Sequence, residues 1–91
     1  MTTARRFRLA EGVLAQTALD EAVLLDARSG TYFGANESAS VLLRALLGGM
    51  DEEQAFAAMK ARFDASDERL RADLSHCLDD WLARGLLVVQ S

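Results

Sequence analysis

Between Gly12 and Asn36, apolar and polar side chains alternate in short runs separated by small or charged residues. A period of two is typical of β-strands, in which successive side chains point to opposite faces. The pattern predicts three strands, which are Val13 to Leu19, Ala22 to Asp26 and Thr31 to Phe33. The intervening turns are predicted at Asp20-Glu21 and at Arg28-Ser29-Gly30, since glycine can take the positive φ of a tight hairpin. Three strands joined this way form an antiparallel meander most simply, with the third strand at an edge.

From Asn36 onward the apolar period changes to 3.6, which is typical of helices. Helix one is expected from its Asn36 cap to about Leu47, and helix two from Asp51, which has capping-box spacing with Gln54, to near Asp64. Helix three begins after Ser66 or Asp64 and ends before Gly85. The tail Leu86 to Val89 is either a closing strand or a plug for the core. The predicted fold class is therefore α+β, a three-stranded antiparallel sheet followed by three helices.

The 91 residues and 51% hydrophobic content predict one folded domain. A meander and three helices resemble a winged helix in outline, and that fold often binds DNA through its third helix. The net charge of −4 and an excess of acidic residues in helix three oppose contact with phosphates. A small DNA-binding regulator thus stays a second hypothesis, and a structural domain that binds nothing is a third.

The sequence predicts no catalytic group, cofactor or metal site. His76 and Cys77 are the only histidine and cysteine, and helix neighbours point about 100° apart, so they cannot act as a pair. Acidic pairs occur mainly at predicted helix starts, where the helix dipole explains them. A single cysteine suits a reducing cytoplasm, and no apolar run is long enough for a signal peptide or a membrane span.

The predicted third strand offers a binding surface, because an edge strand exposes backbone N–H and C=O groups to which another chain can add. Thr31-Tyr32-Phe33-Gly34 contains no charge and no proline, the usual means of blocking such an edge. The alternative is that helix three or the C-terminal tail covers it.

Two stretches are distinctive: VLLDARSGTYFGAN over 23–36 and RADLSHCLDDWLARGLL over 71–87. With the two glycine-terminated helices between them, they resemble the PqqD-like proteins. These are the peptide-recognition domains of pathways that make ribosomally synthesised, post-translationally modified peptides, among them pyrroloquinoline quinone and lasso peptide biosynthesis. The similarity spans roughly Ala22 to Val88.

The resemblance implies a winged-helix-like domain over residues 12–91, after a flexible segment over 1–11, that binds the leader of a precursor peptide. The leader would add as a strand between strand three and helix three, and pass to a leader protease and a maturation enzyme. Lasso peptide biosynthesis is the preferred pathway, and a chaperone of the pyrroloquinoline quinone type is the alternative. The implied peptide-binding residues are Leu25, Thr31, Tyr32, Phe33 and Gly34 in the sheet and Leu70, Asp73, Leu74, Cys77 and Trp81 in helix three.

Overall fold

The meander predicted from the period-two pattern forms one antiparallel sheet in the order β2-β3-β4. The computed structural model describes residues 4–18 and 21–90, so the predicted positions of Leu19 and Asp20 lie outside the described residues. The three strands are β2 (Val13–Ala18), β3 (Glu21–Asp26) and β4 (Thr31–Ala35). Gly30, with φ of 72°, closes the β3–β4 turn as expected.

Three helices follow the sheet, and their caps are those read from the sequence. They are α1 (Glu37–Leu47), α2 (Glu52–Arg62) and α3 (Asp67–Ala83). The Asn36 side chain accepts a hydrogen bond from the Ala39 N–H, and Asp51 and Gln54 form the complete capping box. Ser66, rather than Asp64, caps α3. The prediction of an α+β fold with a three-stranded sheet and three helices is confirmed.

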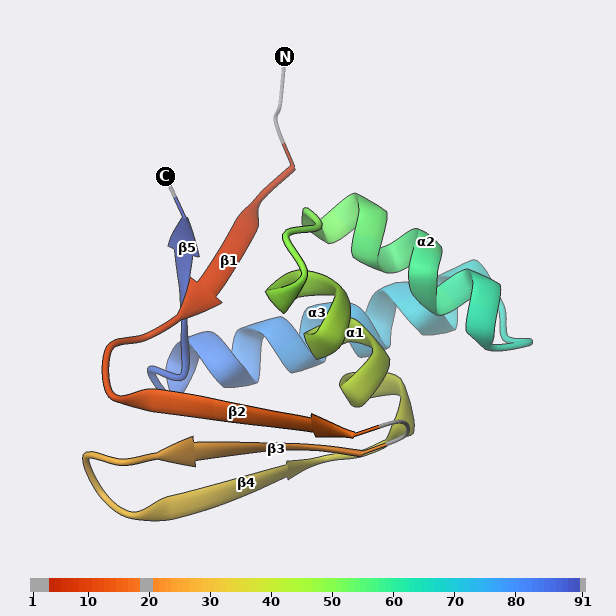
Figure 1. Cartoon of the computed structure of the whole chain (residues 1–91). Coiled ribbons are helices and arrows are strands. Elements are labelled where there is room, and N and C mark those ends of the chain that lie inside the picture. Colours follow the sequence, from red (N-terminus) through yellow and green to blue (C-terminus); the bar gives the residue numbers. More distant parts are fainter. Residues whose placement is uncertain (1–3, 19–20, 91) are drawn as a thin grey trace.

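The core lies between the helices and one face of the sheet (Figure 1). Side chains that alternate along β2 and β3, such as Val13, Ala22 and Leu24, are buried on this face. The helices contribute the other side of the core through Leu42, Leu43, Leu46, Met59, Leu70, Leu74, Leu78 and Trp81. Every second residue of β2 and β3 points to this face, because successive side chains of a strand point to opposite sides of the sheet.

The N-terminal segment is where the structure differs from the sequence prediction. Residues 1–11 were expected to be flexible, but Arg6–Leu9 forms strand β1, which pairs antiparallel with β5 (Leu87–Gln90) in a separate two-stranded sheet. Phe7 is buried in the core, and the backbone and side chain of Arg5 donate hydrogen bonds to the Glu52 carboxylate at the start of α2. The C-terminal tail is therefore a closing strand, one of the two outcomes foreseen.

Candidate functional site

The edge of β4 carries backbone groups that point away from the sheet. In an antiparallel pair, opposite residues alternate between exchanging two hydrogen bonds and exchanging none. The Ala27 N–H donates to the Gly12 carbonyl at 2.9 Å, so the adjacent Val13–Asp26 pair exchanges none and Asp26 directs its backbone groups toward β4. Asp26 is opposite Thr31, so these two residues form a hydrogen-bonded pair. Hydrogen-bonded and non-hydrogen-bonded pairs then alternate along β4.

Thr31, Phe33 and Ala35 therefore direct their N–H and C=O groups toward β3, whereas Tyr32 and Gly34 direct theirs to the open side. Among the described residues, β3 is the one strand paired with β4. The open edge thus offers two N–H donors and two C=O acceptors to another extended chain. The tail does not cover this edge, because β5 pairs with β1.

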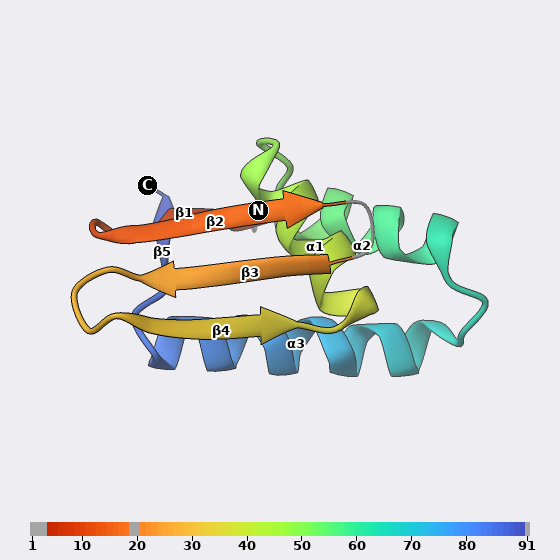
Figure 2. The same ribbon diagram turned by 60° about the horizontal axis from the view of Figure 1, so that its bottom comes forward.

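Helix α3 runs along the β4 edge of the sheet (Figure 2). Leu74, Leu78 and Trp81 face the core, whereas Asp73, Cys77 and Asp80 on the adjoining face are half-buried. Near the end of the helix, the Arg84 guanidinium lies over the Phe33 ring, 5.1 Å from its centroid, and its Nε donates to Asp80 at 2.9 Å. This contact links the C-terminal end of α3 to the middle of β4.

A second arginine holds the β3–β4 turn against the end of α3. Arg28 donates from Nε and Nη2 to the Asp26 carboxylate, and its Nη2 also donates to the Gly85 carbonyl at 3.0 Å. The hydrogen bonds from Arg28 lower the pKa of Asp26 below its ordinary value. Because Arg28 contacts both elements, it sets the spacing between the β4 turn and the end of α3.

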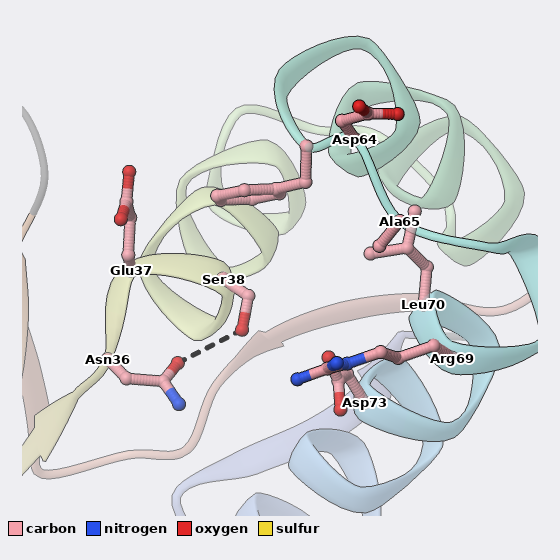
Figure 3. Close-up of a pocket in the computed structure, with 9 residues that line it drawn as sticks. Asn36, Glu37, Ser38, Asp64, Ala65, Arg69, Leu70 and Asp73 are labelled. Carbon is pink, nitrogen blue, oxygen red and sulfur yellow. Dashed lines mark hydrogen bonds between the residues drawn. The ribbon is translucent and has the colours of Figure 1, made fainter.

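A cavity of about 450 Å³ opens at the other end, where β4 leads into α1. Figure 3 shows Asn36, Glu37 and Ser38 on one side and Arg69, Leu70 and Asp73 on the other. Phe63, Asp64 and Ala65, from the loop between α2 and α3, complete the lining. The partly exposed Phe63 supplies apolar surface inside a polar rim, which suits a side chain of an extended peptide that continues past β4.

The face of the sheet that turns away from the helices carries an apolar patch. Tyr32 is 70% exposed and Leu14 is 61% exposed. They border a shallow hollow of about 420 Å³ with Ala15, Gln16, Val23 and Leu25. The solvent-facing side of an antiparallel sheet is ordinarily polar, so this face is the unusual one.

The structure brings together only some of the residues that the sequence suggested. Of the four predicted edge residues, Tyr32 and Gly34 direct their backbone groups to the open side, whereas those of Thr31 and Phe33 face β3. Asp73 and Cys77 lie on the half-buried face of α3. Leu25 and Tyr32 lie on the outer face of the sheet. Leu70, at the base of the end cavity, and Leu74 and Trp81 are 2%, 3% and 6% exposed, so all three belong to the core and have almost no surface to offer a ligand.

Several residues of this region escaped the sequence reasoning. Arg84, Asp80 and Arg28 read as ordinary surface charges along the chain, and Phe63 reads as part of a helix stripe. Phe63 instead follows α2 as its extended C-cap, which turns its ring to the cavity. Helical spacing from Cys77 could have placed Asp73, Asp80 and Arg84 on one face, but only the tertiary structure shows which face borders the strand.

The environment of Cys77 makes it a poor nucleophile. Burial, together with the negative charges of Asp73 and Asp80, raises its pKa to about 11 from the ordinary value of 9.0. Among the described residues, no three His, Cys, Asp or Glu side chains are placed to hold a metal ion. No helix in the described part of the chain is long and apolar enough to cross a membrane.

We expect alkylation of Cys77 by iodoacetamide at pH 8 to be about a hundredfold slower in the folded chain than in the unfolded chain. Thiolate is the reacting form, and below both pKa values its fraction falls tenfold for each unit by which the pKa rises. Because Cys77 is the single cysteine, mass spectrometry reports its rate directly. The same chain in denaturant is the control. A folded-state rate that stops rising by pH 9 would contradict the expectation.

An open sheet edge beside a helix defines a class of small α+β domain that can bind an extended peptide as an added strand. The family model described as coenzyme PQQ synthesis protein D (PqqD) matches residues 21–87. The chain therefore belongs to the PqqD family. No curated protein matches it in sequence.

Two solved structures have the same fold. TbiB1 in complex with the TbiA(beta) leader peptide is 26% identical, with a TM-score of 0.81 over 92% of this chain and 98% of that one. Lasso peptide synthetase B1 complexed with the leader peptide is 22% identical, with a TM-score of 0.80 over 91% of this chain and 98% of that one. The likeness extends over nearly the full length of both proteins.

Proposed function

We propose that this chain is a recognition element that binds the leader segment of a ribosomally synthesised precursor peptide as a strand added to β4. The observation that carries the proposal is the outward direction of the Tyr32 and Gly34 backbone groups, next to α3. Family membership and the leader peptides in the two similar structures support it.

The expected affinity follows from the groups on offer. Four backbone hydrogen bonds at about 1 kcal/mol each, plus two or three buried apolar side chains at roughly 2 kcal/mol each, give on the order of 8–10 kcal/mol gross. Ordering the peptide and restricting its motion cost several kcal/mol of this gross free energy. A dissociation constant from near-micromolar to somewhat tighter results, which suits a peptide that is captured and then released.

In this proposal the chain has no catalytic step of its own. It acts in the cytoplasm and delivers the bound leader to a leader protease and a maturation enzyme. The lasso peptide synthetase B1 among the similar structures favours lasso peptide biosynthesis over the pyrroloquinoline quinone pathway. The high pKa of Cys77 agrees with a binding role.

A DNA-binding role finds no support in α3. Arg71 of α3 and the C-cap residue Arg84 already face carboxylates, since Arg71 pairs with Glu53 and Arg84 pairs with Asp80. Asp67, Glu68, Asp73 and Asp79 lie along the same helix. A helix with this charge would meet phosphates with net repulsion.

The direct test is titration of the chain with the fluorescently labelled leader of the precursor peptide encoded beside its gene. Fluorescence anisotropy should give saturable binding with a dissociation constant in the micromolar range or tighter. A scrambled leader of the same composition is the matched control, and a labelled DNA duplex at low salt tests the alternative. Equal binding of the true and scrambled leaders, or no binding of either, would contradict the proposal.

A further inference from the structure

We infer that the outer face of the sheet contains a subsite for one large apolar side chain of the bound leader. The subsite lies over Gly34 of the edge strand and extends from there toward β3. This inference rests on the proposed function and assigns the leader a second contact surface, separate from α3. The subsite consists of the bare backbone at Gly34 together with the flanking side chains of Val23 and Tyr32.

The pairing geometry decides which leader residues face this side. Residues opposite each other in a sheet place their side chains on the same face. Tyr32 and Gly34 offer outward backbone groups, and the Tyr32 side chain lies on the helix-free face, which Figure 2 turns toward the viewer. The leader residues that pair with Tyr32 and Gly34 therefore direct their side chains to the outer face. The residue between them points to the α3 side.

Gly34 makes room for a large side chain at one of these two positions. A Cβ added at Gly34 would meet no atom within 4 Å, and the backbone there has no positive φ that would require glycine. Val23, directly opposite Gly34 on β3, is half-buried on this face. A long or aromatic side chain paired with Gly34 can lie across the bare backbone toward Val23 and beside the Tyr32 ring.

The chemistry of the face selects an apolar occupant. Leu14, Val23, Leu25 and Tyr32 border the hollow, and the one polar side chain that lines it, Gln16, is uncharged. The hollow itself has no charged lining residue, so a charged leader side chain would lose water there without gaining an opposite charge from it. Four partly exposed side chains offer roughly a few hundred Å², less than the roughly 800 Å² per partner of a stable protein interface. The area is therefore too small for a second copy of the domain. It suits a single side chain of a leader that is already bound at the edge.

The test combines an alanine scan of the labelled leader with the substitution Gly34→Thr. Threonine favours strands, so the variant should stay folded, but its side chain occupies the space above Gly34 and adds a hydroxyl. We expect one large apolar leader residue whose replacement by alanine weakens binding to the wild-type chain about tenfold. Gly34→Thr should weaken binding of the intact leader about tenfold and leave the affinity of that alanine variant nearly unchanged.

Arg8→Thr is the matched control, since it places the same residue at an exposed strand position in the other sheet. It should change leader affinity less than twofold, and circular dichroism of each variant should match the wild type. Additive effects of Gly34→Thr and every leader substitution would overturn the subsite while leaving leader binding intact. Failure of the wild-type chain to bind the leader would overturn the proposed function and the subsite with it.

Discussion

Tyr32→Pro is expected to weaken leader binding about tenfold or more while the domain stays folded. The Tyr32 N–H faces the open edge, so proline removes a donor that the leader would use and places its ring where the incoming strand must approach. Proline is tolerated in edge strands when its missing N–H faces away from the sheet. Isothermal titration with the leader measures the loss, and circular dichroism checks the fold.

Two variants separate the backbone effect from other causes. Tyr32→Ala removes the ring but keeps the N–H, so the difference between Tyr32→Ala and Tyr32→Pro isolates the backbone donor. Phe33→Pro places proline where the N–H faces β3 and also removes a ring that packs against the core. It should lower the free energy of unfolding by about 3 kcal/mol or more. Equal leader affinities for Tyr32→Ala and Tyr32→Pro would show that β4 does not receive the added strand.

Phe7→Ala is expected to lower the free energy of unfolding by about 3–5 kcal/mol, a large part of the 5–15 kcal/mol typical of a small domain. Phe7 is 3% exposed and lies opposite Val89 in the β1–β5 pair. Removal of its ring leaves a cavity and weakens the attachment of the N-terminal strand. Urea denaturation followed by circular dichroism measures the change.

Arg8→Ala is the control on the same strand, because the Arg8 side chain is exposed and its loss should cost well under 1 kcal/mol. Leader affinity of the folded Phe7→Ala chain should match the wild type, since β1 belongs to a different sheet from β4. A destabilisation below 1 kcal/mol for Phe7→Ala would mean that the N-terminal segment is not held in the core.

The helices and the meander could be predicted because their signals are local. Asn36, Asp51 and Ser66 cap helices through hydrogen bonds within three residues along the chain, and Gly30 closes a turn between adjacent strands. Such contacts depend on the neighbouring sequence alone. The edge position of β4 followed from the same logic, since the three strands pair in sequence order.

The pairing of β1 with β5 could not be predicted, because it joins residues about eighty positions apart, and four residues at each end have little pattern of their own. The contacts that connect the sheet to the end of α3 likewise join residues far apart in the sequence. Arg28 donates to the Gly85 carbonyl, and the Arg84 guanidinium lies over the Phe33 ring. Spacing along α3 defines its faces but does not say which one the sheet will border.

The edge position of β4 was thus determined by the sequence alone, because turn residues and strand order are short-range properties. Only the tertiary structure decided that the C-terminal tail leaves this edge open, since β5 pairs with β1, and how the edge can be used. The alternation of hydrogen-bonded pairs along the sheet directs the backbone groups of Tyr32 and Gly34 outward and those of Thr31 and Phe33 toward β3. Helix packing places Leu74 and Trp81 in the core and leaves Asp73 and Cys77 on the half-buried face of α3. Both outcomes depend on register and on packing between elements, which arise only when the whole chain folds.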